Sequence, residues 1–267
     1  MTNINDKLQM YGKTSLVTGA NGHLGSKISV ALAECGSNLV LVDHHRSNFH
    51  ATEAAISAVS DSKVISIKCD LSQEASRIQA INNIKSHVKS LNCLINNAAF
   101  VASSDTSGWS VPFDKQSLNA WNCALEVNLT APFHLCQSLR SIMTNSMSAN
   151  IINISSIYGA LGPDWRLYDD TNMANPAAYS VSKGGLIQLT RWLATTLAPS
   201  IRVNSISPGG IFRNQDPRFV QRYESKCPLN RMATEDDVVG AVLYLASELS
   251  SYVTGENLYV DGGWSKW

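Results

Sequence analysis

The residues with the clearest chemical potential are a tyrosine and a lysine in the second half of the chain. Tyr179 and Lys183 stand four apart in a segment of helical periodicity, so both side chains should lie on one helix face. A free tyrosine titrates near ~10, too high for an efficient base at neutral pH. A nearby ammonium favours the phenolate and lowers that pKa. The pair therefore predicts a centre for proton transfer.

A hydroxyl that can polarise a substrate oxygen would complete such a centre. Ser155 and Ser156 follow the fifth apolar run of the chain and fit that role. Alone, Tyr179 and Lys183 would more often be an ordinary pair on a surface helix. A second signal is needed to favour the chemical interpretation.

That signal is a glycine-rich turn at Thr18–Gly25, between the first apolar run and a helical segment. Glycines there allow a tight turn, close approach of the backbone to a pyrophosphate, and strand–helix packing, while N–H groups at the helix start hold phosphates. A glycine pattern alone is weak, but its place inside a strand–helix–strand unit strengthens it. It predicts a nicotinamide dinucleotide, whose oxidised ring would further favour the Tyr179 phenolate.

Two carboxylates are expected near the adenosine. Asp43 ends the second strand, 18 residues after Gly25, where it can accept from both ribose hydroxyls and repel a 2′-phosphate. This favours NAD over NADP, although Arg46 could reach a phosphate; alternatively, Asp43 only caps the next turn. Asp70 should meet the adenine edge, cap the helix expected from Ser72, or do both.

The elements that must position these residues alternate between short apolar runs and helical segments. Runs apolar on both faces and separated by helices indicate a parallel sheet covered on both sides. We predict one domain over residues 1–267, α/β, doubly wound and Rossmann-like, with about seven strands. The predicted strands are Thr14–Thr18, Asn38–Val42, Lys63–Lys68, Cys93–Ile95, Asn150–Ile154, Arg202–Ile206 and Asn257–Val260. The predicted helices are Leu24–Cys35, Thr52–Val59, Ser72–Val88, Leu118–Met143, Ala177–Leu197 and Glu235–Ala246.

Segments 100–117, 157–176 and 209–234 are too long to be simple turns. Each follows a strand at the carboxyl edge of the sheet, where ligands bind in such folds. They are the predicted substrate loops.

In order along the chain, these motifs resemble the short-chain dehydrogenase/reductase family over nearly the whole length. The residues that carry the resemblance are Thr18–Gly25, Asp70, Asn96-Asn97-Ala98-Ala99, Asn128, Ser155-Ser156, Tyr179 and Lys183, Pro208-Gly209, Thr254-Gly255 and Val260-Asp261-Gly262-Gly263. The resemblance implies that Tyr179 is the acid/base, that Lys183 lowers its pKa and binds ribose, that Ser156 orients the substrate oxygen, and that Asn128 holds a water. The implied cofactor contacts are Gly19, Asn21, Gly22, His23, Leu24, Gly25, Asp43, Asp70, Leu71, Asn97, Ala98, Tyr179, Lys183, Pro208, Gly209 and Ile211.

The chain departs from the family pattern in three places. The middle glycine of the usual turn is replaced by His23, with Gly22 before it, as in the longer sugar-nucleotide branch. Arg213 stands where a threonine normally contacts the carboxamide, so the Ile211 backbone is expected to substitute. Ser156 and Tyr179 are 23 apart, about ten more than is common, so the insertion should loop over the site.

Within the family, the residues after Ser207 and the inserted loop look like the flagellin-modification protein A group, which is associated with nonulosonic sugars of surface glycans. Two alternatives stay open: an epimerase or dehydratase with tightly held NAD, suggested by Gly22, and a non-catalytic dinucleotide-binding regulator. The short chain end argues against the first, and the intact Ser–Tyr–Lys set argues against the second.

The long loops carry residues suited to an anionic, polyhydroxylated substrate. Guanidinium groups bind phosphate or carboxylate, and aromatic rings can stack on a sugar face. Equally, these arginines can be solvated and paired with loop aspartates. The predicted substrate contacts are Ser156, Tyr158, Trp165, Arg166 and Arg213.

The charge, the apolar runs and the cysteine content of the chain exclude several classes of partner. With 21 basic and 21 acidic residues, the chain has no basic excess for nucleic acid. It has no apolar run of spanning length and no secretory signal, so we expect no membrane partner. Six scattered cysteines without a CxxC pair indicate a reducing compartment, the cytoplasm, and predict no metal site. The apolar residues of Ala177–Leu197, by family resemblance, predict a homotetramer or dimer.

Overall fold

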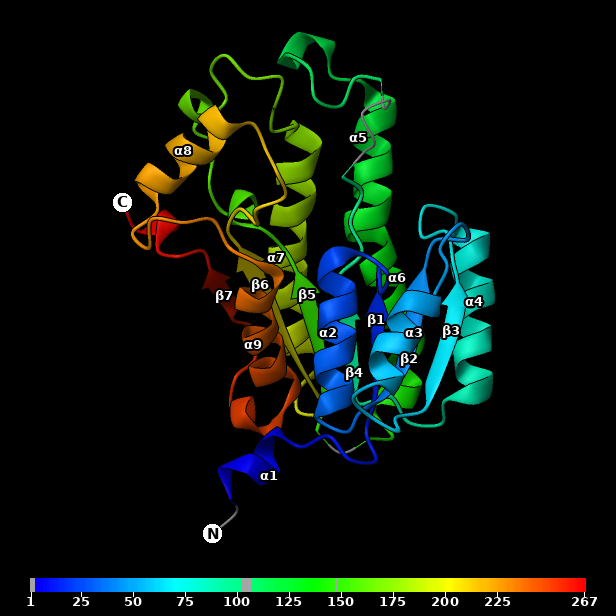
Figure 1. Ribbon diagram of the computed structural model, residues 1–267. Coiled ribbons are helices and arrows are strands. Elements are labelled where there is room, and N and C mark those ends of the chain that lie inside the picture. Colours follow the sequence, from blue (N-terminus) through cyan, green and yellow to red (C-terminus); the bar gives the residue numbers. More distant parts are fainter. Residues whose placement is uncertain (1–2, 102–106, 147) are drawn as a thin grey trace.

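A single seven-stranded parallel sheet organises the chain in the computed structural model, which describes residues 3–101, 107–146 and 148–267 (Figure 1). The strand order is β3-β2-β1-β4-β5-β6-β7, which is the doubly wound arrangement that the sequence predicts. The strands are β1 (Thr14–Thr18), β2 (Asn38–Asp43), β3 (Val64–Lys68), β4 (Cys93–Asn96), β5 (Ala149–Ile154), β6 (Ile201–Pro208) and β7 (Asn257–Val260).

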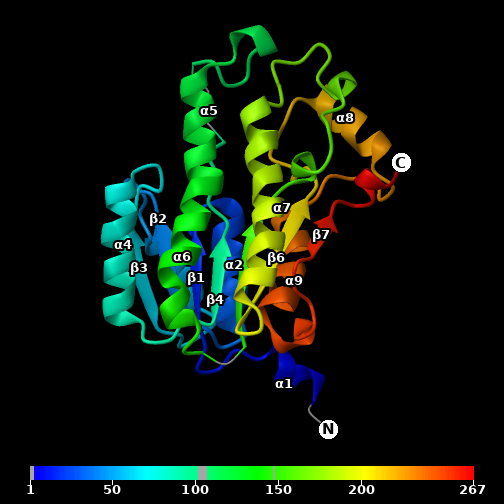
Figure 2. The ribbon, with the colours of Figure 1, turned by 180° about the vertical axis from the view of Figure 1, so that it is seen from behind.

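Helices cover both faces of the sheet, because its strands are apolar on both sides. One face carries α2 (His23–Glu34), α3 (His50–Ser57) and α9 (Glu235–Ala246), seen in front in Figure 1. The other carries α4 (Glu74–His87), α6 (Ala131–Met143) and α7 (Ala177–Leu197), seen in front in Figure 2. Each layer forms its own apolar core with the sheet. The short helix α1 (Ile4–Leu8) lies at the end of the molecule that bears the amino ends of the strands.

Two helical features differ from the sequence-based expectation. The predicted helix Leu118–Met143 is interrupted: α5 (Leu118–Leu125) passes into a wide π-helical turn, Glu126–Thr130, before α6 begins. The predicted loop 209–234 contains α8 (Pro217–Lys226). Asp216 accepts from the N–H of Arg218 and Pro217 occupies the first turn, a start signal that the sequence already carried.

The predicted loops gather above the carboxyl ends of the strands (Figure 1). Segment 157–176 holds two 3₁₀ turns, Ile157–Gly159 and Trp165–Leu167, and packs with α8 and Trp264 in an aromatic cluster. Segment 100–117 ends in the 3₁₀ turn Phe113–Lys115; its residues 102–106 lie outside the described part of the chain. Across the described residues, every helix is too short or too polar to cross a bilayer.

Candidate active site

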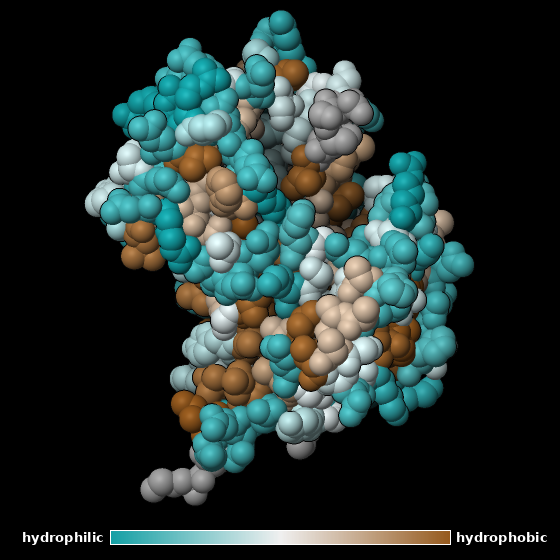
Figure 3. Space-filling view, in the orientation of Figure 1, coloured by the Kyte–Doolittle hydropathy of each residue, from teal (hydrophilic) through white to brown (hydrophobic). Residues whose placement is uncertain are grey.

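A cavity of about 820 Å³ opens at the carboxyl edge of the sheet. Its wall runs from Asp43 and Asp70, at the ends of β2 and β3, to Ser156, Tyr179 and Lys183. The space-filling view shows the molecule hollowed above α2, with hydrophobic side chains visible inside the hollow (Figure 3). The structure thus brings the predicted dinucleotide end and the predicted chemical end to one continuous space.

The glycine turn packs so tightly that Gly19 and Gly25 have no room for a side chain. Gly19 has a positive φ of 65°, and a Cβ on Gly25 would collide with the carbonyl of Gly19. The Asn97 side chain donates to the carbonyls of Thr18 (3.0 Å) and Gly19 (3.2 Å), which ties the end of β4 to the turn. At the start of α2, Gly22 has no side chain with which to cap the helix. The N–H groups of the first helical turn are therefore left for an anion.

Asp43 combines the two roles that the sequence left open. One carboxylate oxygen accepts from the N–H of His44 and the hydroxyl of Ser47, both at 2.7 Å. The other accepts from the N–H of Asn21 at 2.7 Å and retains a lone pair. Asp43 caps its turn and also lines the cavity.

Asn21 differs from the other predicted cofactor contacts at the dinucleotide end of the cavity. Its side-chain oxygen accepts from Thr52 at 2.9 Å, and it is not part of the cavity wall. It therefore positions Asp43 through its N–H, and the expected direct cofactor contact is not supported. Gly19, Gly22, His23, Leu24, Gly25, Leu71, Asn97 and Ala98 do line the cavity.

Asp70 caps a turn that precedes α4, because α4 begins only at Glu74. Its Oδ1 atom accepts from the N–H (3.0 Å) and the hydroxyl (2.6 Å) of Ser72. Burial raises the pKa of Asp70, but the Ser72 hydrogen bonds and the nearby His44 outweigh burial and lower the pKa overall. Asp70 thus stays an acceptor in the cavity wall.

Tyr179 and Lys183 face the same space from the first turns of α7. The Nζ atom of Lys183 is buried, donates to the carbonyl of Ile154 at 2.7 Å, and lies 6.0 Å from the centre of the Tyr179 ring. Burial lowers the pKa of Lys183 to about 8. Burial also raises the pKa of Tyr179, against a lowering by the Ser156 side chain and by the charge of Arg213. The ammonium of Lys183 is bound by the carbonyl of Ile154, and the lowering of the Tyr179 pKa that the family resemblance implies stays a prediction.

The two serines that follow β5 have separate tasks. Ser155 donates to the carbonyl of Lys183 at 2.9 Å and so fastens β5 to α7. Ser156 accepts from the N–H of Tyr158 at 3.2 Å and interacts with the phenol of Tyr179. These contacts support the prediction that Ser156, and not Ser155, meets a substrate oxygen.

Asn128 sits behind the cavity wall, fully buried in the π-helical turn. Its side chain accepts from the N–H of Phe100 at 2.6 Å and donates to Ser182 at 3.0 Å. Pro132, four residues later, has no N–H to give to the Asn128 carbonyl. The implied water of Asn128 would therefore have to bind this carbonyl, because the side chain is engaged.

The loop after β6 contributes Pro208, Gly209 and Ile211 to the wall, where the predicted contacts with a cofactor could form. The carbonyl of Ile211 accepts from Gln215 at 2.7 Å, so any contact from this backbone to a carboxamide would be made by its N–H. Arg213 also lines the cavity, while its guanidinium pairs with Glu235 at 3.0 Å.

The predicted substrate residues separate into two groups. Ser156, Tyr158 and Arg213 line the cavity, but Trp165 is 55% exposed and, with Arg166, lies outside the wall. Arg166 pairs with Asp164, two residues before it, at 2.9 Å. The other loop arginines are paired as well: Arg218 with Asp216, Arg222 with Asp170 and Arg231 with Asp237. For these four arginines, the alternative of solvated, paired loop charges is the one that the structure favours.

Several wall residues escaped the sequence analysis. Some could have been found because they follow strand ends, where this edge must lie. Others come from α5 and the π-helical turn, where Pro132 was the one local sign of an irregular helix. The additional residues include His44, Cys69 and Ser72 after strand ends and Cys123 and Val127 from the helical segment, while Phe100, Gly210 and Gln215 come from the predicted substrate loops.

Together the fold and the site define a Rossmann-type oxidoreductase in which a glycine turn and a Ser–Tyr–Lys set share one cavity. The chain belongs to the short-chain dehydrogenase/reductase family: residues 19–265 match the family described as enoyl-(acyl carrier protein) reductase. It is 32% identical over 262 residues to the 3-oxoacyl-(acyl-carrier-protein) reductase FabG of Aquifex aeolicus, covering 96% of this chain and 99% of that protein. It is 28% identical over 267 residues to the post-translational flagellin modification protein A of Campylobacter coli (96% and 99%) and 30% over 264 residues to glucose 1-dehydrogenase 2 of Bacillus subtilis (95% and 95%).

Solved structures agree with this assignment. A short chain dehydrogenase from Leptospira borgpetersenii with bound NAD⁺ is similar with a TM-score of 0.82 and 32% identity, covering 99% of this chain and 96% of that one. The NADPH-dependent 3-quinuclidinone reductase from Rhodotorula rubra is similar with a TM-score of 0.87 and 27% identity (100% and 96%). Relatives therefore include proteins of either cofactor type.

Proposed function

We propose that this protein is an NAD(H)-dependent oxidoreductase that interconverts an alcohol and a ketone on a sugar or sugar-derived substrate. The observation that carries the proposal is the continuity of the cavity from Asp43 to Tyr179, with Ser156 and Lys183 beside the phenol. A dinucleotide fits these residues: the uncapped first turn of α2 would hold its phosphates, Asp43 the adenosine ribose and Lys183 the other ribose. When bound, the nicotinamide would accept or deliver the hydride.

The chain's own residues would handle the proton. Ser156 would hold the substrate oxygen, and Tyr179 would give that oxygen a proton in the reducing direction or remove it in the oxidising one. Because burial raises the pKa of Tyr179, the neutral, proton-donating phenol is the favoured resting form. Arg213 counteracts this effect and so helps the phenolate form when a proton has to be removed.

The preference for NAD rests on Asp43. A 2′-phosphate would bring a second negative group beside the Asp43 carboxylate, which three hydrogen bonds hold in place. The lone pair left on Oδ2 suits a ribose hydroxyl.

The sugar substrate is supported by a pair of phenols. Tyr158 lines the cavity next to Ser156, and its hydroxyl is 2.9 Å from that of Tyr168, which comes from the insertion. Because Tyr168 donates within the pair, the proton of the Tyr158 hydroxyl remains for a substrate hydroxyl. Arg213 would suit an anionic group on the same substrate. The likeness to a flagellin modification protein and to a glucose dehydrogenase supports a role in surface-glycan, nonulosonic acid chemistry.

Two further parts of the proposal concern the protein's surroundings. Val181 (48% exposed) and Trp192 (56%) on α7 and Phe133 (41%) on α6 leave apolar surface uncovered, which favours a dimer or tetramer. All six cysteines are free, which favours the cytoplasm.

Cofactor titration tests the proposal first. Tag-free protein is titrated with NADH and with NADPH, and the preferred one is then used with sugars, sugar phosphates and plain aliphatic ketones. We expect tighter binding of NADH and turnover of a polyhydroxylated compound. Failure to bind either dinucleotide would contradict the function, and a preference for apolar ketones would contradict the sugar. Retention of the dinucleotide through every turnover would favour an epimerase or dehydratase.

Tyr179→Phe separates an enzyme from a regulator. This variant removes only the hydroxyl, so it should bind NADH as the wild type does while turnover falls by about 10²-fold or more, the usual contribution of a positioned acid/base. Unchanged turnover would refute the role given to Tyr179.

A further inference from the structure

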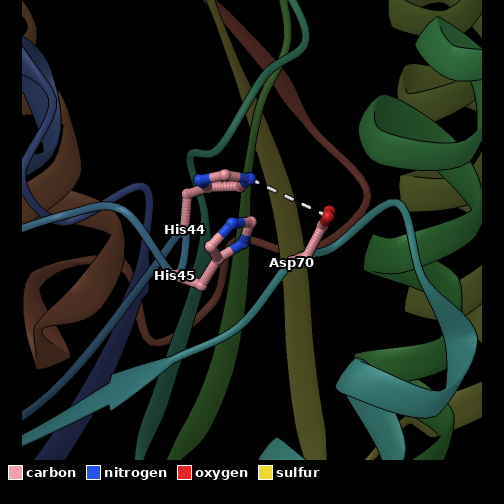
Figure 4. Close-up of side chains that lie close together, drawn as sticks. All are labelled: His44, His45 and Asp70. Carbon is pink, nitrogen blue, oxygen red and sulfur yellow. Dashed lines mark ion pairs between the residues drawn. The ribbon is translucent and has the colours of Figure 1, made fainter.

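A second cluster of chemically capable side chains lies at the adenosine end of the cavity. His44 and His45 follow β2, and Asp70 follows the neighbouring strand β3. Among the residues that the structure describes, these three form the one group of histidine, cysteine and carboxylate side chains whose ligand atoms all lie within 4.8 Å of one another. The close-up shows both imidazole rings and the carboxylate directed to a common space (Figure 4).

The backbone holds this cluster in place. The N–H of Cys69 donates to the carbonyl of Asp43 at 2.7 Å, which locks the two strand ends side by side. The N–H of His44 is bound by the Asp43 carboxylate, and Asp70 is oriented by Ser72 through its Oδ1 atom alone. The Oδ2 atom of Asp70 is left facing the Nε2 atom of His44 at 3.8 Å.

Two imidazole nitrogens and one carboxylate oxygen form a donor set that suits Zn²⁺ and related divalent ions. Ligands at about 2.0–2.2 Å from such an ion stand at most ~4.4 Å apart, so modest side-chain rotations would close the site. His45 is exposed and can rotate toward the other two side chains, which already face each other, because Ser72 holds Asp70 and the N–H of Arg46 contacts His44.

We propose that His44, His45 and Asp70 bind a divalent transition-metal ion, with Zn²⁺ as the best match, and that this ion competes with the dinucleotide. His44 and Asp70 both line the cavity, so an ion held between them occupies the space that an adenine base needs. The scattered cysteines predicted no metal site, and a histidine pair and an aspartate on neighbouring strands form no local cysteine motif that would have indicated one. The competition rests on the proposed dinucleotide function; the binding of the ion does not.

The test begins without any dinucleotide. Tag-free protein freed of metal by a chelator is titrated calorimetrically with ZnCl₂, and we expect one ion per chain. His44→Gln and His45→Gln should each weaken Zn²⁺ affinity by about tenfold or more, since even loss of an outer-shell partner typically costs about 10-fold to 100-fold. His87→Gln is the matched control: this exposed histidine lies at the far end of α4, and its replacement should leave Zn²⁺ binding unchanged.

A second titration measures the competition. The apparent Kd of NADH, followed by fluorescence, should rise in proportion to added ZnCl₂ in the wild type and in His87→Gln, and much less in His45→Gln. Absence of Zn²⁺ binding, or equal binding by both variants and the wild type, would overturn the metal site. Zn²⁺ binding that leaves the Kd of NADH unchanged would overturn the competition. If one Zn²⁺ binds and both histidine variants lose it while NADH never binds, the metal site stands and the dinucleotide function fails.

Discussion

The ammonium of Lys183 lies 6.0 Å from the centre of the Tyr179 ring, on the same side of α7. Burial acts on the two groups in opposite directions: it lowers the pKa of the lysine to about 8 and raises that of the tyrosine. Both effects favour the neutral forms. The chain alone therefore does not create a phenolate, and a positive ligand in the cavity would have to supply the remaining stabilisation.

Replacing Lys183 by Met should stabilise the fold while abolishing turnover. The unperturbed pKa of lysine is 10.5 and the folded value is about 8, so keeping the buried ammonium costs up to about 3 kcal/mol below pH 8. The unfolded chain binds more protons between these values, so this lysine's contribution makes the wild type more stable as pH rises from about 8 to about 10.5. In denaturant unfolding, the variant should have a higher free energy of unfolding than the wild type. The difference should be largest near neutrality and shrink with rising pH. A difference in the free energy of unfolding that grows with pH would contradict the lowered pKa of Lys183.

Replacement by alanine should have different effects at the adjacent residues Ser155 and Ser156. Ser156→Ala should reduce turnover by about tenfold or more with little loss of stability, because its hydroxyl meets the substrate oxygen. Ser155→Ala removes one buried hydrogen bond to the carbonyl of Lys183, which keeps its helical partner, and should cost about 0.5–1.5 kcal/mol of stability. Steady-state kinetics and thermal unfolding of the two variants measure the contrast. Equal kinetic losses at equal stability would show that the two serines share one task.

Asp43→Asn tests the basis of cofactor choice. The amide keeps the shape of the side chain but removes the charge that opposes a 2′-phosphate, so the ratio of NADPH to NADH affinity should rise by about tenfold, or about 1.4 kcal/mol. Stability should fall slightly, because Asp43 accepts from His44, Asn21 and Ser47. Fluorescence titration with both reduced dinucleotides gives the ratio. A ratio that stays at the wild-type value would exclude Asp43 as the selecting residue.

Tyr168→Phe tests the role of the insertion. The variant retains the ring packed on Phe219 but leaves the Tyr158 hydroxyl without its partner at 2.9 Å. We expect kcat/KM for a polyhydroxylated substrate to fall about 5-fold to 10-fold, corresponding to one hydrogen bond of about 1 kcal/mol, while a plain ketone is affected little. Trp165→Phe is the matched control, since Trp165 lies outside the cavity wall. Equal effects on both substrate types would indicate a purely structural role for the phenol pair.

The features predictable from sequence are those set by local patterns. Strand runs such as Asn38–Asp43 are apolar on both faces, and the parallel order follows from the alternation with helices. The site residues predicted best follow strand ends directly, as Ser156 and Asp70 do. Their approach to one another needs no long-range detail beyond the sheet itself.

The features that escaped prediction depend on pairing between side chains. Trp165 and Arg166 lie in a loop over the site, yet Asp164 holds Arg166 away from the cavity. The side chain of Asn21 is engaged by Thr52, 31 residues away, which no local pattern reveals. The break within the helix Leu118–Met143 is different, because Pro132 marks it locally: a proline has no N–H for the carbonyl four residues before it.

The π-helical turn Glu126–Thr130 amounts to one inserted residue between the α-helices α5 and α6. Deleting a single residue there would restore regular winding, but it would also rotate α5 by about 100° relative to α6, since a helix makes one turn every 3.6 residues. The face of α5 that carries Ala120 and Ala124, packed beside Tyr179, would then swing elsewhere, and Cys123 would move with it. The phase of one helix thus decides which side chains the reacting phenol has as neighbours.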